Sequence, residues 1–414
     1  HGTLPQEPFA SMVVLGELAL DGKVRSVRGV LPALIAAYKS GITRAIVPAA
    51  NRSEAALMTQ MEILTFESLR EVLLWGRTGE HPIAQELDLE PTDVDEYLDF
   101  ADVAGQSKAR FAAEVAASGG HHLLLIGPPG TGKTMIASRI PTILPSLTID
   151  QALEVTAVHS ISGALGSRSP MSLVAPIVSP HHTTTRVAMV GGGSHSIKPG
   201  ACSLAHYGVL FVDEAPECGP GVLDSLRQPL ESGTITIARS IGNLTFPAQF
   251  LLVLAANPCP CGKFTGRGRN CTCTSQQVRR YLGKLSGPLM DRIDLRVQVE
   301  PVGRVDMAKT QLGESSAVIR ERVIKARSIA AKRFEGMGWS LNSQIPARAL
   351  RAEFQPERTA MNFLHDELDR EHITARGLHK IIRTSWSFAD LNGHKVPTME
   401  DVLAAHTMRG KVEA

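Results

Sequence analysis

The chain has 414 residues, more than one hydrophobic core usually serves, so we expect two or three domains. Its 43 basic and 41 acidic side chains leave a formal charge of +2, so any surface that binds nucleic acid must be local. No apolar run reaches the roughly 20 residues of a membrane-spanning helix, and His1 opens no signal-peptide pattern. We therefore expect a cytoplasmic protein without membrane contact. Because the chain begins with His rather than Met, we also expect it to be an N-terminally truncated part of a longer protein.

Residues 1–85 form the first predicted domain, a small α/β unit. The segments VVLGEL and AIVPAA have the composition of strands, and LPALIAAYKSG and SEAALMTQM have helical apolar spacing. Residues 86–99 are acidic and interrupted by Pro91, which is typical of an exposed linker.

Residues 100–300 alternate apolar strand-like runs with helical stretches. The runs are HLLLIG, GVLFVDE, FLLVLAAN and RIDLRVQV, and this alternation predicts a parallel sheet covered by helices. Long helical patterns replace the strand signal over residues 301–414. The predicted fold class is therefore α/β, with a helical domain at the C-terminal end.

A phosphate-binding loop is predicted at GPPGTGKT, which follows an apolar strand and precedes a helix. Its glycines let backbone N–H groups face phosphate oxygens, its lysine reaches the β and γ phosphates, and its final threonine is a ligand for Mg²⁺. The residues of this loop are Gly127, Pro128, Pro129, Gly130, Thr131, Gly132, Lys133 and Thr134.

Polar side chains end two further predicted strands. Asp213 and Glu214 close GVLFVDE, where a carboxylate would hold the Mg²⁺ shell and a second one would activate the attacking water. Asn257 closes FLLVLAAN and would sense the γ-phosphate, although an asparagine before Pro258 also suits a simple turn. Together with the phosphate loop, these residues indicate hydrolysis of ATP.

Four of the six cysteines are crowded into one short segment. Cys259, Cys261, Cys271 and Cys273 form two C-x-C pairs, and four thiolates that converge suit Zn²⁺. The enclosed segment contains Lys263, Arg267 and Arg269. We therefore expect a loop that a structural zinc ion holds in place and that contacts DNA.

Two other segments are candidates for contacting DNA. LESGTITIARSIGNLTFPAQF alternates like a β-hairpin, with Arg239 near its tip, and VGGGSHSIKPG is a glycine-rich loop that carries Lys198. Arg239 or Lys198 could instead be an ordinary basic residue on the protein surface.

The motifs GPPGTGKT, GVLFVDE, AANP, SGPLMDRIDL and ITARGLH resemble those of the magnesium-chelatase-like AAA+ ATPases. SPHHTTTRVAMVGGGSHSIKPG, NPCPCGKF and LGELALDGKVRSVRGVLPALIAAYKSG narrow the resemblance to the ComM/YifB branch. The resemblance implies a homo-hexameric ring with ATP between subunits and, for competence members, a helicase that drives branch migration of DNA. It also implies that Arg292 is an arginine finger and Arg376 a second sensor.

The N-terminal unit resembles the second half of a Lon-protease-like domain. Leu31 and Ala33 occupy the positions where a lysine would activate a serine, so we do not expect a protease. The segment VAPIVSPHH lacks the basic stretch that family members carry before Pro-His-His. For His181 and His182 we favour a structural or interface role over a metal pair.

Two alternatives to a DNA motor remain. The chain could be a motor subunit of a magnesium chelatase, which shares the core, although the Lon-like unit and the cysteine loop are not expected there. A near-neutral chain could also remodel other proteins without DNA.

Overall fold

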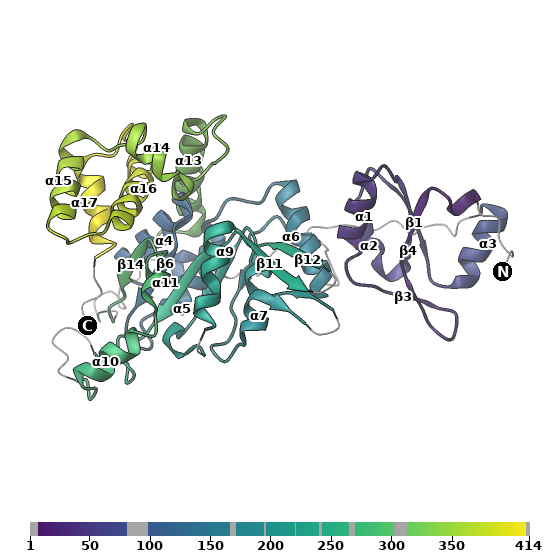
Figure 1. Cartoon of the computed structure of the whole chain (residues 1–414), viewed down its shortest axis with the longest axis horizontal. Coiled ribbons are helices and arrows are strands. Elements are labelled where there is room, and N and C mark those ends of the chain that lie inside the picture. The colour runs from purple at the N-terminus through teal and green to yellow at the C-terminus, as the bar shows by residue number, and fades with distance from the viewer. Residues whose placement is uncertain are drawn as a thin grey trace. The chain divides into compact units, whose positions relative to one another are not determined.

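The computed structural model describes residues 7–80, 98–165, 171–193, 196–219, 221–239, 242–264, 270–301, 303 and 313–410. The chain forms two compact units (Figure 1). The first unit comprises His1–Val94, Leu147–Leu173 and Gly193–Pro199; the second comprises Asp95–Ser146, Val174–Gly192 and Gly200–Ala414. The predicted linker at 86–99 lies almost entirely outside the described residues.

The first unit is built on a three-stranded parallel sheet of order β1-β4-β5. Leu31 and Leu34 of its first long helix are fully buried in the apolar core beside this sheet. The strands are β1 (Met12–Val14), β4 (Arg44–Pro48) and β5 (Glu62–Phe66), with β2 (Glu17–Leu18) and β3 (Val24–Arg25) as a small antiparallel pair; the helices are η1 (Glu7–Phe9), α1 (Val30–Lys39), η2 (Ala49–Asn51), α2 (Arg52–Ala55) and α3 (Leu69–Thr78).

Helix α6 (Ile149–Ser162) also belongs to the first unit, although it lies inside the range 100–300 that the sequence assigns to the ATPase core. It begins at a capping box between Thr148 and Gln151. Leu153 and Ala157 pack against the core of the first unit, and Ser160 donates a hydrogen bond to the buried Glu54. Segments that are separate in sequence therefore share one hydrophobic core.

The second unit contains a five-stranded sheet of order β14-β6-β13-β10-β7, in which every pair is parallel. The strands are β6 (Leu123–Ile126), β7 (Ile177–Val178), β10 (Val209–Val212), β13 (Leu251–Ala256) and β14 (Leu295–Gln298). All residues of β6, β10 and β13 are buried, as expected of strands covered on both faces. The predicted α/β class with a parallel sheet is confirmed.

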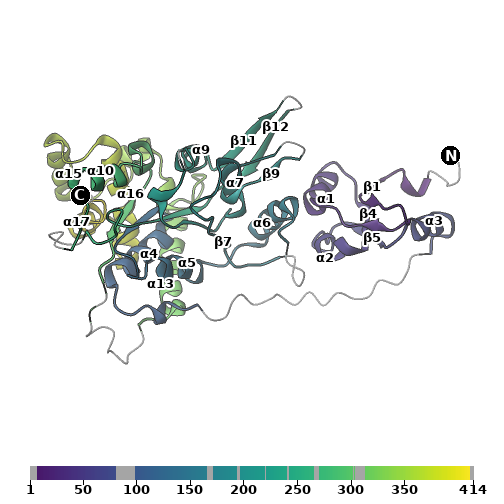
Figure 2. The same ribbon diagram turned by 90° about the horizontal axis from the view of Figure 1, so that it is seen from below.

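Helices and short elements surround this sheet (Figures 1 and 2). The longest of those that precede the C-terminal helices is α4, which ends at a left-handed Gly120. The elements are η3 (Phe100–Asp102), α4 (Ser107–Gly119), α5 (Lys133–Ile143), α7 (Arg186–Val190), β8 (Gly191–Gly192), α8 (Ala201–Leu204), η4 (Ala215–Glu217), η5 (Leu223–Leu226), α9 (Arg227–Ser232), α10 (Ser275–Leu282) and α11 (Gly287–Met290). The short strand β9 (Lys198–Pro199) belongs to the first unit.

An antiparallel hairpin of β11 (Thr234–Arg239) and β12 (Gly242–Pro247) projects from the body of the second unit (Figure 2). Ile235 and Phe246 are paired near its base and are buried, whereas Arg239 is exposed at the end of β11. The predicted hairpin is therefore present.

The C-terminal part is helical, as predicted. Helix α16 packs against α4, where Phe388 makes an edge-to-face contact with Phe111 at 5.6 Å between ring centroids. His121, two residues before β6, lies 2.7 Å from the Ser387 hydroxyl and adds a polar contact. The helices are α13 (Ser316–Arg333), η6 (Asn342–Gln344), α14 (Ala347–Ala352), α15 (Arg358–Asp369), α16 (Ala375–Asn392) and α17 (Met399–Thr407).

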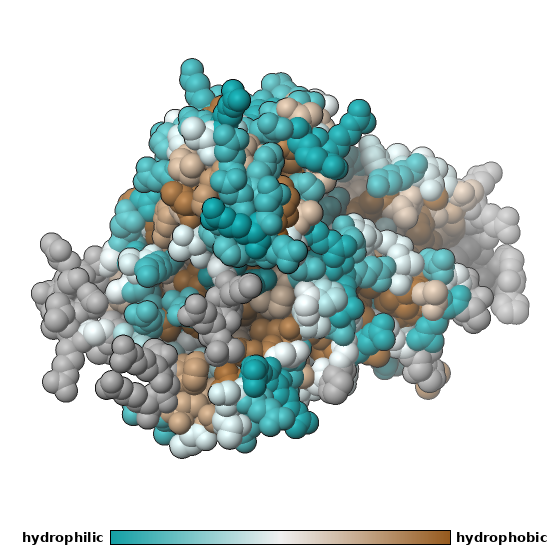
Figure 3. All heavy atoms as spheres, turned by 60° about the vertical axis from the view of Figure 1, so that its left-hand side comes forward, coloured by the Kyte–Doolittle hydropathy of each residue, from teal (hydrophilic) through white to brown (hydrophobic). Residues whose placement is uncertain are grey.

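Within the described residues, no helix combines the length and apolar character needed to cross a bilayer. The face of the molecule in Figure 3 is mainly hydrophilic, with hydrophobic side chains interspersed among polar ones. Such scattered apolar surface is normal for folded domains and marks no particular partner.

Candidate nucleotide-binding site

The phosphate loop connects the buried strand β6 to the first turn of α5. Gly130 and Gly132 have φ angles of 75° and 91°, which glycine adopts without the steric cost of a side chain. A Cβ on Gly127 would lie 2.2 Å from the Val299 carbonyl oxygen, so only glycine fits beside the neighbouring backbone. The loop precedes a helix N-terminus, where backbone N–H groups and the helix dipole favour phosphate.

Lys133 is buried, with 7% of its surface exposed. Its Nζ donates to the carbonyl oxygens of Gly127 at 2.6 Å and Pro128 at 2.8 Å, and to Asn257 Oδ1 at 3.2 Å. Burial lowers the pKa of its ammonium group, while the carboxylates of Asp213 and Glu214 oppose that change. The structure thus brings the loop lysine and Asn257 together.

Thr134 and Asp213 also meet. The Thr134 hydroxyl donates to Asp213 Oδ2 at 2.7 Å, and the Glu214 backbone N–H donates to Asp213 Oδ1 at 2.8 Å. A hydroxyl and a carboxylate are hard oxygen ligands of the kind Mg²⁺ prefers. These residues fit an Mg²⁺ ion, which would neutralise charge on the phosphates of a bound nucleotide.

Glu214 follows β10 in a left-handed conformation, with φ 48° and ψ 41°. Such a backbone is uncommon for a residue other than glycine and clusters at functional sites. Its Oε2 lies 3.1 Å from His182 Nδ1. The His182 ring stacks on His181 at 4.1 Å between centroids, and His181 Nδ1 lies 2.8 Å from the Thr183 hydroxyl.

His182 is a residue of the site that the sequence did not identify. The structural or interface role favoured for it did not include contact with the proposed catalytic carboxylate. The one signal in the sequence was its position shortly after the apolar pair of β7, a strand that pairs with β10. A pattern of two residues is too short to predict a strand, and the sequence gives no indication of which strands are neighbours.

The two candidate arginines each contact a residue in or directly after α11. Arg292 donates to Glu231 Oε2 at 2.7 Å and to the Pro288 carbonyl at 2.8 Å. Arg376 contacts Asp291 at 3.4 Å, and its side chain is 76% exposed. Both guanidinium groups are therefore held by acidic residues outside the phosphate loop.

The candidate DNA-contacting residues are distributed over several elements. Arg239 is the last residue of β11, and Lys198 begins β9; both are exposed. Lys263 is exposed directly after the first cysteine pair. Arg267 and Arg269 lie outside the described residues.

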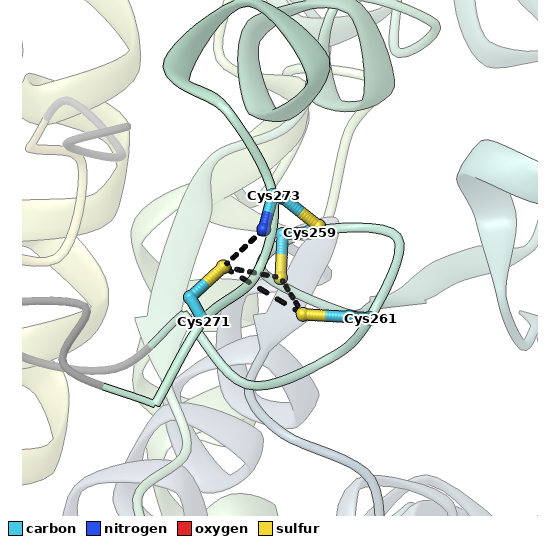
Figure 4. A group of neighbouring side chains, drawn as sticks. All are labelled: Cys259, Cys261, Cys271 and Cys273. Carbon is cyan, nitrogen blue, oxygen red and sulfur yellow. Dashed lines mark hydrogen bonds between the residues drawn. The ribbon is translucent and has the colours of Figure 1, made fainter.

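The four clustered cysteines converge, and their sulfur atoms all lie within 4.8 Å of one another (Figure 4). The cluster begins two residues after Asn257, so it adjoins the nucleotide site in sequence. Cys202 is buried, and burial raises the pKa of its thiol to about 12. Cys218 is partly buried, and the pKa of its thiol is raised by burial and then by Glu217.

Three sequence families match successive parts of the chain. "Magnesium chelatase, subunit ChlI" matches residues 99–307, the C-terminal part of that subunit matches residues 313–409, and "Subunit ChlI of Mg-chelatase" matches residues 2–51. The first match covers the five-stranded sheet and every residue of the phosphate loop. The second covers the C-terminal helices.

Individual relatives are similar over nearly the whole chain. An uncharacterized protein of Mycobacterium tuberculosis is 46% identical over 98% of this chain and 80% of its own length. Competence protein ComM of Haemophilus influenzae is 38% identical over 92% of this chain and 74% of its own. The uncharacterized protein YifB of Escherichia coli is 38% identical over 96% and 76%, respectively. The chain therefore belongs to the magnesium-chelatase family and is a ComM/YifB-like, AAA+-like ATPase.

Proposed function

We propose that the chain is an ATP-hydrolysing motor that works as a hexameric ring on DNA and drives branch migration during recombination. The observation that carries the motor part is that Lys133 and Thr134, which begin α5, hydrogen-bond to Asn257 and Asp213, respectively. Asn257 and Asp213 directly follow the neighbouring strands β13 and β10. The DNA part is supported by the projecting hairpin and by similarity to a relative named as a competence protein. ATP and Mg²⁺ are the cofactors of this proposal, with a structural Zn²⁺ at the cysteines.

In the proposed reaction, the loop N–H groups and Lys133 bind the β and γ phosphates. Thr134 and Asp213 hold Mg²⁺, and Asn257 orients the γ-phosphate or the water beside it. Glu214 accepts the proton of that water as its oxygen attacks phosphorus and the bond to ADP breaks. His182, at 3.1 Å from Glu214, orients the carboxylate.

Arg292 is proposed to act on the ATP of a neighbouring subunit. Its side chain contacts Glu231 of α9 and the Pro288 carbonyl of α11. An arginine supplied by a neighbour makes hydrolysis depend on ring assembly. Arg376, on α16, is proposed as the second sensor because an exposed guanidinium on the helical part can follow the nucleotide state.

The hairpin is proposed to contact the DNA backbone through Arg239. It is a β ribbon with an exposed basic residue at the end of its first strand, a shape and charge suited to a phosphate chain. Lys198 and the basic residues between the cysteines, Lys263, Arg267 and Arg269, are secondary candidates.

The direct test is the ATPase rate of the full chain without DNA and with single strands, duplex or a four-way junction, each at two salt concentrations. We expect stimulation by single-stranded or branched DNA that weakens at high salt. Arg239→Ala should reduce this stimulation and flatten the salt dependence by about one unit of logarithmic slope. Arg348→Ala, at an exposed position on α14, is the matched control and should behave as wild type.

A magnesium-chelatase-type motor subunit is the second candidate, because the matching family model carries that description. An assembled ring that hydrolyses ATP at the same rate with and without each DNA substrate would contradict the DNA proposal. A higher ATPase rate in the presence of a porphyrin-handling partner would then favour the chelatase function. If neither DNA nor such a partner raises the ATPase rate, the result would favour an ATP-driven protein remodeller.

A further inference from the structure

The geometry of the cysteine cluster suits one tetrahedral metal ion. Cys259 Sγ lies 3.4 Å from Cys261 Sγ and 3.6 Å from Cys271 Sγ, and the sulfurs of Cys261 and Cys271 are 3.6 Å apart. Cys273 Sγ lies within 4.8 Å of these three sulfurs. Zn–S bonds of about 2.3 Å in a tetrahedron separate the sulfurs by about 3.8 Å. An iron–sulfur cluster would spread the sulfurs farther, because its cysteines bind different iron atoms.

A backbone N–H group contributes to the outer shell that is expected around metal-bound sulfurs. The Cys273 N–H donates to Cys271 Sγ at 3.4 Å. Such bonds orient metal-bound thiolates and offset their negative charge. Cys259 is fully buried, while the other three cysteines are partly exposed, so a metal ion has access to the cluster.

The first cysteine pair lies against the phosphate loop. Gly262 is buried with a φ of 73°, and its N–H donates to the Cys259 carbonyl at 2.9 Å. A Cβ on Gly262 would lie 2.5 Å from Pro129 Cδ and 2.8 Å from Pro129 Cγ. The turn and the loop are therefore in direct contact, with no room for a side chain between them.

The cluster also joins β13, which ends beside the nucleotide site, to α10. Cys259 follows β13 and Asn257, and Cys273 directly precedes Thr274, which caps α10 in a capping box with Gln277. The described residues between β13 and α10 form no helix or strand, so regular backbone hydrogen bonding does little to fix the turn. A metal ion would supply that order, since ligand convergence and local folding are coupled.

We infer that Cys259, Cys261, Cys271 and Cys273 bind one Zn²⁺ and that the metal-bound turn braces the phosphate loop through the contact of Gly262 with Pro129. Loading of the zinc site therefore sets the affinity for ATP. The inference rests on the zinc and ATP sites of the proposed function, and it is independent of DNA. Failure of the DNA proposal would leave it intact.

The metal is tested by elemental analysis of the full chain after gel filtration in chelator-free buffer. We expect about one zinc per chain in the wild type and loss of most of it in Cys271→Ser. Cys218→Ser, outside the cluster, should keep its zinc. Iron in place of zinc, a wild type that neither contains nor takes up zinc, or a disulfide between these cysteines would overturn the metal assignment.

The brace is tested by titrating each variant with a fluorescent ATP analogue in the absence of DNA. Cys271→Ser should raise the Kd about tenfold. Gly262→Ala keeps all four thiols and should keep its zinc, yet its Cβ displaces the loop and should raise the Kd similarly. The matched control is Gly336→Ala, because Gly336 has a similar φ of 79° with nothing within 4 Å of its Cβ position.

Gly262→Ala decides the matter even where Cys271→Ser fails to fold, which circular dichroism would reveal. The brace is supported if Gly262→Ala retains its zinc but has a raised Kd for the ATP analogue, while Gly336→Ala has an unchanged Kd. An ATP affinity equal to that of the wild type in Gly262→Ala, or in a folded, zinc-free Cys271→Ser, would overturn it.

Discussion

The ammonium group of Lys133 contacts two loop carbonyls and the Asn257 amide oxygen, a position from which it reaches the phosphates of a bound nucleotide. Lys133→Ala should abolish nucleotide binding, because no other cation of the loop replaces its charge. Glu214→Gln should bind ATP normally and hydrolyse it slower by a factor on the order of 10² or more. Nucleotide titration and steady-state ATPase assays separate the two effects; equal loss of binding in both variants would contradict the assigned roles.

His182 is expected to act through Glu214 as a positioning residue. His182→Ala should lower kcat about tenfold and leave the KM for ATP unchanged, because the carboxylate loses its orienting contact while the phosphate loop is intact. His182→Asn places an amide N–H near the position of the imidazole Nδ1 and should recover part of the loss. A rise in kcat, or an equal defect in both variants, would show that His182 does not orient Glu214.

Residues of the phosphate loop were predictable because a contiguous motif fixes which atoms face the ligand. The acidic pair was predictable from its place at the end of an apolar strand. The contact of His182 with Glu214 was not, because it depends on the pairing of β7 with β10 across a gap in sequence. The same applies to Gly262 and Pro129, whose contact requires the folded turn.

At the scale of elements, the four apolar runs are found as β6, β10, β13 and β14. Their apolar composition was enough to predict these strands, because strands buried on both faces are continuously apolar. The sequence did not identify β7, which has only two residues. Nor did it show that α6 packs on the first unit, since an amphipathic pattern predicts a helix and not its partner.

The burial of His121, which lies near the start of β6 and contacts Ser387 of α16, predicts how the free energy of unfolding depends on pH. Burial lowers the pKa of His121 from 6.5 to about 4, although Asp294 opposes that change. The folded chain keeps His121 neutral while the unfolded chain takes up a proton, so the free energy of unfolding should fall as the pH drops from about 6.5 toward 4. The loss is about 2 kcal/mol at pH 5.

Urea unfolding at pH 7.5 and pH 5 measures this loss. His121→Gln has no imidazole to titrate at this position. The difference in unfolding free energy between the two pH values should therefore be about 2 kcal/mol smaller in this variant than in the wild type. The variant's lower stability at pH 7.5 does not affect this comparison. An identical pH dependence in the two proteins would mean that His121 is not responsible.

At the scale of the whole molecule, the proposed ring makes each ATP site depend on a neighbouring chain. Arg292→Ala should abolish hydrolysis in a uniform ring. Mixing it with Lys133→Ala, which supplies Arg292 but cannot bind ATP, should restore part of the activity at mixed interfaces. ATPase measurements over a range of mixing ratios check this, and mixtures that assemble yet stay inactive would contradict action between subunits.

The most direct measurement is the conversion of a fluorescently labelled four-way DNA junction into duplex products by the full chain with ATP and Mg²⁺. We predict conversion by the wild type at a rate that follows ATP hydrolysis, and none by Glu214→Gln, which still binds both ATP and junction. A wild-type ring that assembles and hydrolyses ATP but leaves the junction unchanged would contradict the account of this chain as a branch-migration motor.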